Sequence, residues 1–319
     1  MFLTSIRGIV EFIQRSSSSY KWRADTRRSN TFFKAQHLES ISGSLKSPLA
    51  NQVKRALHRP LPRSCKRVET LKYIPEYEEE EGHSPTLLEL AKLDFNLLQH
   101  VYLKELKSAT EWWNHFSGYI KLDFIRDRLV ESYTWAYVLY YEKDSALPRS
   151  ILTKIIVLIT TLDDIYDIRA STEECRKLHE AIQSWDESAI SLLPEYLRNL
   201  YKELLRTFKN IEDQIPVNMN YDITHLKKSI QKHVTGYLQE AEWSHKSYKP
   251  SFKDQVNLTC LTIGAPSVCT SMMVGMGDPI MKQALEWTAS VPDVVVAAGK
   301  VVRLMNDIAA FEVYIVLQE

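Results

Sequence analysis

The chain has 319 residues, which at roughly 150 residues per domain corresponds to two average domains or one large one. Hydrophobic residues make up 45% and charged residues 25% of it, the composition of an ordinary globular protein with a substantial core. Lys and Arg number 40, as do Asp and Glu, so the bulk positive charge of a nucleic-acid-binding protein is absent. Only 9 glycines are present, which argues against a turn-rich β protein.

The glycine and cysteine patterns exclude several kinds of site. There is no GxxxxGK[ST], and the one G-x-G, Gly275–Gly277, does not continue into a dinucleotide-binding motif. Any bound phosphate must therefore be held by a metal or by arginine. The four cysteines form no C-x-x-C pair, which favours a reducing compartment over a zinc or disulfide framework. The longest apolar stretch, Ile151–Leu162, is broken by Lys154 and is too short to predict a membrane span.

The first quarter of the chain is predicted to be separate from the rest. Residues 1–35 form an unassigned basic, Ser-rich segment that loosely resembles a transit peptide, the alternative being a disordered arm. Residues 36–75 contain a short helical piece that ends at the prolines Pro60 and Pro62. The acidic run Pro75–Gly82 predicts a linker because proline and glycine flank it. A third segment, residues 76–319, is predicted to form the main domain.

From Ser84 onward, apolar residues recur every three or four positions almost without pause. Ser84 and Pro85 are typical of a helix start, with a capping residue before a proline in the first turn. No alternating strand pattern competes, so the sequence predicts an all-α fold with one large bundle-like domain. Pro266 is expected to kink its helix. After the helix that starts at Ser84, the predicted helices are 129–142, 149–167, 172–184, 194–213, 222–248, 253–275, 280–290 and 293–313.

An acidic cluster ends the most apolar of these helices. Ile151–Leu162 is apolar on nearly every side, so this helix is predicted to be buried. It runs into Asp163, Asp164 and Asp167, and Ser171–Glu174 has the capping-box pattern that opens the next helix. Three carboxylates therefore occupy the last turns of a buried helix. Both the partial negative charge of the helix C-terminus and mutual repulsion disfavour that arrangement.

A divalent cation would relieve both penalties. Asp163 and Asp167 are four residues apart and share a face, whereas Asp164 is turned about 100° from Asp163. Oxygen ligands without His or Cys suit Mg²⁺, with Mn²⁺ as an alternative, and Mg²⁺ is usually completed by water and substrate phosphates. The plainer alternative is an acidic helix end that faces solvent.

Two arginine-bearing segments are candidate partners of this cluster. Arg126 and Arg128 can serve one ligand only in a loop or extended stretch, where two guanidinium groups can grip a diphosphate. Arg303 and Asn306 are neighbours on another apolar helix, and on a buried face they would need polar partners. A metal-bound diphosphate or the polar groups of another helix would serve equally well. Trp135 could line a pocket behind the arginines, although core packing is the default for a helical Trp.

These motifs, taken together, resemble those of class I terpene synthases of plants, most closely their sesquiterpene synthases. The resemblance runs from about residue 37 to residue 313, and several motifs in the same order are specific where one alone is not. It implies an all-α class I terpenoid synthase bundle, incomplete at the C-terminus, with residues 36–75 as a remnant of an N-terminal α-domain. The shared motifs are Arg126–Glu131 leading to Trp135, Asp163–Asp167, and Arg303 with Asn306–Ile308.

The resemblance also implies a chemistry. It implies Mg²⁺-dependent ionisation of a prenyl diphosphate, farnesyl diphosphate in the sesquiterpene synthases, and cyclisation of the carbocation. The Trp ring would stabilise that cation through its face, and the apolar cavity would exclude water. The implied residues are metal ligands (Asp163, Asp167 and Asn306), diphosphate ligands (Arg126, Arg128 and Arg303) and catalytic residues (Asp164, which assists the metal, and Trp135).

The second metal motif departs from the family pattern. That pattern has Asn or Asp, then Ser, Thr or Gly four residues on, then Glu at eight, where this sequence has Asn306, Ala310 and Tyr314. Family members also continue beyond the position of Glu319. We therefore expect a member truncated at both ends, with an impaired second metal site and a pocket open to water.

Three functional hypotheses follow. The first is a sesquiterpene synthase-like lyase, and the second is a catalytically inactive remnant of one. The third is a chain-elongating prenyl transferase, against which the absence of a second DDxxD argues. The expected partner is a prenyl diphosphate substrate, and no nucleic acid is expected to bind. The chain is expected to be a monomer without a membrane span. The sesquiterpene likeness implies a cytoplasmic location, and the basic start leaves a plastid as the alternative.

Overall fold

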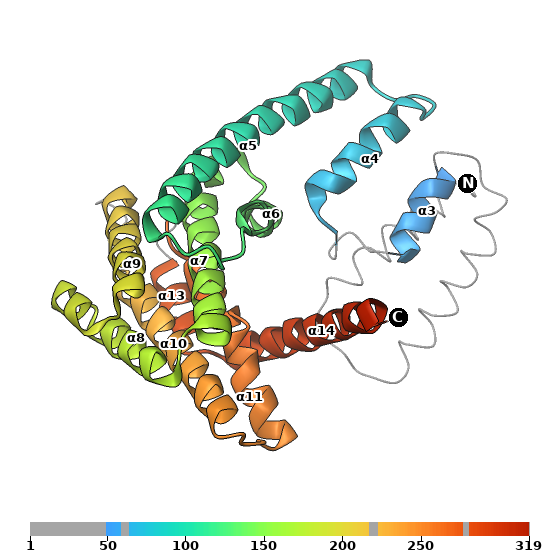
Figure 1. Cartoon of the computed structure of the whole chain (residues 1–319). Coiled ribbons are helices and arrows are strands. Elements are labelled where there is room, and N and C mark those ends of the chain that lie inside the picture. The colour runs from blue at the N-terminus through green and yellow to red at the C-terminus, as the bar shows by residue number, and fades with distance from the viewer. Residues whose placement is uncertain (1–48, 59–63, 217–222, 277–280, 319) are drawn as a thin grey trace. The chain divides into compact units, whose positions relative to one another are not determined.

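A computed structural model describes residues 49–58, 64–216, 223–276 and 281–318 (Figure 1). Nearly all regular elements in these ranges are α-helices, joined by short 3₁₀ and π turns, and no strand occurs among the described residues. The all-α prediction is therefore confirmed. The chain divides into two units, residues 1–102 and 103–319, and the long helix α5 (Pro85–Ile120) contributes to both. The basic Ser-rich segment 1–35 lies outside the described residues.

The first unit contains α3 (Leu49–His58), α4 (Lys66–Glu78) and the beginning of α5. Ion pairs are its most prominent contacts. Arg55 on α3 pairs with Glu76 and with Glu69, the latter at 3.3 Å, and Arg67 pairs with Asp94 at 3.2 Å. The Glu76 contact uses both carboxylate oxygens, a geometry that gives the pair direction as well as attraction.

The predicted linker at Pro75–Gly82 is wrong in its first half. α4 continues through Pro75 to Glu78, and only residues 79–83 form a turn before α5. Proline costs the helix one backbone donor, but two neighbouring side chains have partners that hold this end of it. Glu76 binds Arg55, and the Tyr77 hydroxyl accepts a hydrogen bond from the Ser84 backbone at 3.0 Å. The proposed domain limits at residues 35 and 75 stay predictions.

The second unit is a helical bundle. Among the described residues, nine helices follow α5 where eight are predicted; α8 matches residue for residue, and α9 and α13 match within one residue at each end. The two departures are a wider π turn after α7 and a break inside the predicted helix 253–275. The helices after α5 are α6 (Leu129–Leu139), α7 (Ala146–Asp164), α8 (Thr172–Ser184), α9 (Glu195–Gln214), α10 (Thr224–His245), α11 (Phe252–Thr262), α12 (Ala265–Ser271), α13 (Met281–Ala289) and α14 (Asp293–Gln318).

α7 is the central helix of this unit and packs against α6, α9, α10 and α12 (Figure 1). Its apolar residues from Ile151 to Leu162 are buried on nearly every side, as predicted. By length and composition alone, the stretch 143–169 is apolar enough to cross a membrane, but 61% of its apolar window is buried inside the bundle. A core helix of a bundle has the same composition.

The predicted helix 253–275 is two helices rather than one kinked helix. α11 ends at Thr262, and Gly264 adopts a φ of 96°, a left-handed conformation that glycine tolerates without strain. Pro266 then lies in the first turn of α12, where its missing N–H has no intrahelical partner to lose. Sequence periodicity alone does not reveal this break because apolar residues continue on both sides of it.

Gly299 allows α14 to pack directly on the backbone of α11. A Cβ atom at this position would lie 2.2 Å from the carbonyl oxygen of Cys260, closer than any side chain tolerates. Gly118 on α5 is the opposite case, because a Cβ there would meet nothing within 4 Å. The two helical glycines thus differ in packing but not in secondary structure.

We predict that Gly299→Ala destabilises the protein by about 1–3 kcal/mol, because α14 must move away from α11. The matched substitution Gly118→Ala is expected to stabilise it by about 0.5–1 kcal/mol, since alanine is the better helix former. Urea denaturation of both variants measures the difference. Equal stabilities of the two variants would contradict this account of the α11–α14 contact.

His233 is a buried titratable group in the core beside α12. Its side chain is 5% exposed, and its Nδ1 lies 3.1 Å from the Ser267 hydroxyl oxygen, while Nε2 has no hydrogen-bond partner. Burial lowers the pKa of His233 to about 4, although the nearby Thr262 backbone partly offsets that effect. The imidazole is therefore neutral in the folded protein and must charge on unfolding in acid.

This burial predicts a pH-dependent loss of stability. Because the folded pKa is below the unfolded value of about 6.5, the free energy of unfolding falls as pH drops through the window from 6.5 to 4, by about 2 kcal/mol at pH 5. His233→Gln removes this contribution and should flatten the dependence between pH 7 and pH 5. Urea melts at both pH values test this. A variant with the same slope as the parent would show that other groups account for it.

Candidate active site

The loop before α6 is attached to the end of α7 by Arg126. Its backbone N–H donates to Asp164 Oδ2 at 2.9 Å, and its side chain donates to Asp164 Oδ1 at 2.5 Å and to Asp163 Oδ2 at 3.0 Å. Residues 121–128 are not helical, which confirms the condition required for Arg126 and Arg128 to serve one ligand. Asp164 is completely buried, so one carboxylate fixes both the loop and the guanidinium.

A π turn at Ile165–Arg169 carries the last aspartate of the cluster. Such wider turns are uncommon and often occur at functional sites. Asp163 and Asp167 both line a large cavity, whereas Asp164 does not. Asp163 and Asp164, predicted to point about 100° apart, thus have different surroundings. Asp163 lines the cavity, whereas Asp164 is buried against Arg126.

The cavity has a volume of about 1430 Å³. Its walls come from α6, α7, α8, α10, α11, α12 and α14, with apolar side chains such as Ile156, Ile159, Val268 and Met272. Of the eight site residues proposed from the sequence, all but Asp164 line it. These seven are Arg126, Arg128, Trp135, Asp163, Asp167, Arg303 and Asn306.

α6 is held in place by a buried arginine of α7. Arg149 is fully buried and donates to both carboxylate oxygens of Glu105 at 2.7 Å, and to the carbonyl oxygens of Tyr140 and Glu142 after α6. This network fixes the end of the helix that carries Trp135. Trp135 itself is 54% exposed and lines the cavity, so it is not a core residue.

Arg303 and Asn306 line the cavity, and they do not lie on a buried face. Asn306 is exposed and Arg303 only half-buried, with Asp307 of the same helix as its ion-pair partner. α14 packs on α11 and α12 around Gly299, and its described residues from Val301 to Phe311 extend past that contact. An apolar composition was therefore a poor guide to burial in this helix.

Glu240 on α10 is a cavity carboxylate that the sequence reasoning missed. The Thr262 hydroxyl donates to it at 3.0 Å, and burial raises the pKa of Glu240 to about 7, with Asp167 and Asp163 adding to the effect. Nothing in the periodicity of α10 distinguishes this glutamate from the solvent-facing ones.

The carboxylates of the cavity repel one another. Desolvation by burial raises the pKa of Asp163, although Arg126 opposes this effect. Desolvation also raises the pKa of Asp167, and the nearby charge of Asp163 raises it further. Arg128 forms an ion pair with Glu131 at the surface, with 2.7 Å between the guanidinium nitrogen and the carboxylate oxygen. Negative oxygen donors thus occupy one side of an apolar cavity, and arginines lie next to them.

The donor set suits Mg²⁺. Among the described residues, no three His, Cys, Asp or Glu side chains already form a metal-binding group. Mg²⁺ does not need one, because one or two carboxylates, water and substrate phosphates normally complete its shell. Asp163, Asp167 and Glu240 offer only oxygen, and a cation bound there would offset the desolvation and the mutual repulsion that raise their pKa values.

Comparison with known proteins identifies the family of this chain. The terpene synthase family, metal binding domain, matches residues 115–314. Tau-cadinol synthase and alpha-copaene synthase of Zea mays are 47% and 44% identical to the chain, each over 88% of it. These matches cover 52% and 54% of the two synthases, so the chain spans about half the length of the curated relatives it matches.

Solved structures show the same fold. Isoprene synthase from grey poplar, in complex with three Mg²⁺ ions and dimethylallyl-S-thiolodiphosphate, has a TM-score of 0.80 and 30% identity, covering 91% of this chain and 56% of that one. Abietadiene synthase from Abies grandis is 22% identical and has a TM-score of 0.85. This match in fold covers 97% of the present chain and 43% of the abietadiene synthase chain. With its helical bundle, its aspartate-ended central helix and this family match, the chain belongs to the terpene synthase family.

Proposed function

We propose that this chain is the core of a lyase that ionises a prenyl diphosphate and cyclises the carbocation to a sesquiterpene. The proposed substrate is farnesyl diphosphate. One observation carries the proposal. Carboxylates and arginines of opposite charge converge on a single large cavity whose remaining walls are mainly apolar. That combination suits a ligand with a highly charged head and a hydrocarbon tail. The sesquiterpene synthases among the relatives support the choice of substrate.

Asp163 and Asp167 are the proposed metal ligands, with Glu240 beside them and Asn306 on the facing helix. When bound, Mg²⁺ supplies Lewis acidity that stabilises negative charge on the leaving diphosphate. Asp164 lies behind this group, and we assign it a positioning role. Its carboxylate is fully occupied by Arg126, so it keeps the guanidinium oriented toward Asp163 and the cavity.

The three arginines are proposed to hold the diphosphate as it leaves. Arg126 is pre-positioned by its two aspartates. Arg128 and Arg303 each pair with a carboxylate of their own helix turn, Glu131 and Asp307. Exposed pairs of this kind contribute little to stability, so a diphosphate with more negative charge can replace either partner.

The rest of the cavity serves the hydrocarbon part of the substrate. Trp135 presents an aromatic ring, whose face attracts a cation, and Ile156, Ile159 and Val268 present surfaces that offer no nucleophile. Such walls keep water from a carbocation only where they enclose it. Trp135 is more than half exposed, and so is Met305 near Asn306.

That exposure favours a second candidate, a catalytically weak or inactive terpene synthase-like protein. Ala310 occupies a position where the family pattern has a hydroxyl residue or glycine, and it is exposed in this structure. The metal site around Asn306 then has fewer donors than the family pattern provides. The two candidates differ in turnover and product, but not in the use of Asp163 and Asp167.

We predict that Asp163→Asn lowers kcat/KM for Mg²⁺-dependent consumption of farnesyl diphosphate at least about 100-fold, corresponding to ~2.7 kcal/mol of transition-state stabilisation. The measurement is release of pyrophosphate as a function of Mg²⁺ concentration. Asp213→Asn is the control, because Asp213 pairs with Lys209 on α9 and lies outside the cavity. Equal rates for the two variants would rule out the aspartate cluster as the metal site.

The second candidate predicts that the product of the chain is mainly the acyclic alcohol, because water reaches the cation in an exposed cavity, whereas the first predicts a cyclic sesquiterpene. Incubation with farnesyl diphosphate and Mg²⁺, followed by gas chromatography of the extract, separates the outcomes. Normal turnover to a cyclic hydrocarbon would contradict the prediction of weak cyclisation. A longer diphosphate would instead identify a chain-elongating prenyl transferase.

A further inference from the structure

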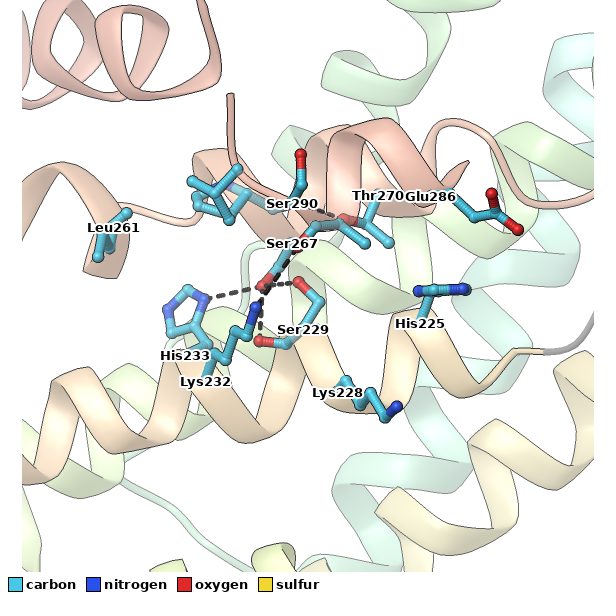
Figure 2. Close-up of a pocket in the computed structure, with 13 residues that line it drawn as sticks. His225, Lys228, Ser229, Lys232, His233, Leu261, Ser267, Thr270, Glu286 and Ser290 are labelled. Carbon is cyan, nitrogen blue, oxygen red and sulfur yellow. Dashed lines mark hydrogen bonds between the residues drawn. The ribbon is translucent and has the colours of Figure 1, made fainter. Parts of the chain in front are cut away.

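A second, smaller cavity lies on the other face of α12. Val268 and Cys269 of that helix line the large cavity, whereas Ser267 and Thr270 line the second one. Its volume is about 310 Å³, and its other walls come from α10, α13 and the turn that follows α13. Figure 2 shows that lysine, histidine and serine side chains project from these elements around one space. Nothing in the proposed lyase mechanism uses this cavity.

The floor of the second cavity is polar and buried. The Ser229 hydroxyl donates to Ser267 Oγ at 3.0 Å, and the same oxygen lies 3.1 Å from Nδ1 of His233 (Figure 2). Ser229, Ser267 and His233 are all less than 9% exposed. The rest of the lining is mainly apolar, so these buried polar groups are the part of the cavity that suits a polar ligand or water.

The rim is positively charged. His225, Lys228 and Lys232 follow one another at spacings of three and four residues, so they form one face of α10. Neither lysine belongs to an ion pair of the described residues. The Lys232 ammonium group donates a hydrogen bond to the Ala289 carbonyl oxygen at 3.4 Å. Glu286 is the single carboxylate among the described residues that line this cavity. Two lysines and one carboxylate therefore line this cavity.

One wall is strained. Val291 lines the cavity with a φ of 56°, in the left-handed region that a β-branched side chain rarely adopts. Pro292 follows it, and the Val291 N–H is held by the Thr288 carbonyl at 3.0 Å. Conformations of this kind cluster at ligand sites, where the surrounding structure maintains them. The strained residue is thus found at the cavity with the unpaired lysines.

We propose that the second cavity binds a phosphate group, either free or as a small phosphate ester. Lys228 and Lys232 would hold the charge as point cations, a mode in which lysine commonly binds phosphate. Leu261 and Val291 provide apolar surface beside them for the body of an ester. The site is distinct from the diphosphate site of the large cavity because α12 separates the two and no residue lines both.

Calorimetric titration of the full chain with inorganic phosphate and with butyl phosphate tests this proposal. Mg²⁺ is omitted and Arg128→Gln/Arg303→Gln serves as the background, so that binding in the large cavity is weakened. We expect one saturable site in this background. Tighter binding of butyl phosphate would identify an ester as the ligand, and equal binding would identify free phosphate.

Variants on one helix locate the site. Lys228→Gln/Lys232→Gln should weaken binding by about tenfold. Lys227→Gln is the matched control, since Lys227 is the next residue on α10 but faces Glu212 at 3.8 Å and does not line the cavity. Glu286→Gln should tighten binding about threefold by removing the opposing charge. The proposal is overturned if no saturable binding occurs below about 10 mM, if the double variant binds as the control does, or if Glu286→Gln weakens binding.

Discussion

The contact between Arg126 and Asp164 is the constraint on which the candidate active site depends. Asp164 has no access to solvent, and a buried carboxylate is costly unless its oxygens are satisfied. The backbone and side chain of Arg126 satisfy both of them, and the same guanidinium reaches Asp163. One ion pair therefore joins the loop before α6 to the end of α7. It thereby connects the segment that carries Arg128 to Asp163 and the cavity.

A second consequence follows from the apolar character of α7. Other helices cover most of its sides, Ile156 and Ile159 contribute apolar wall to the cavity, and the charged groups are concentrated at its C-terminal end. Desolvation and mutual repulsion raise the pKa values of Asp163, Asp167 and Glu240. The protein maintains this unfavourable cluster within reach of arginines, which is the arrangement expected of a site that recruits cations and phosphates.

The two faces of α12 differ in the same physical terms. Toward the large cavity it presents apolar side chains beside the carboxylates. Toward the smaller one it presents the hydroxyl groups of Ser267 and Thr270, in a cavity that Lys228 and Lys232 also line. The short helix exists because Gly264 ends α11 with a left-handed φ and Pro266 fits the first turn of a new helix. A local backbone feature thus forms the wall between two cavities of opposite charge preference.

The sequence by itself determined the helical class, most helix limits, the buried α7 and the face shared by Asp163 and Asp167, because these follow from local periodicity and spacing. It also singled out the arginines, although only their order along the chain resembled a known family. Tertiary structure decided the partner of Asp164, the exposure of Asn306, the place of Glu240 and the continuation of α4 through Pro75. Each of these depends on which helices pack together, and residues far apart in the chain, such as Arg126 and Asp164 or Arg55 and Glu76, leave no periodic signal of their contact.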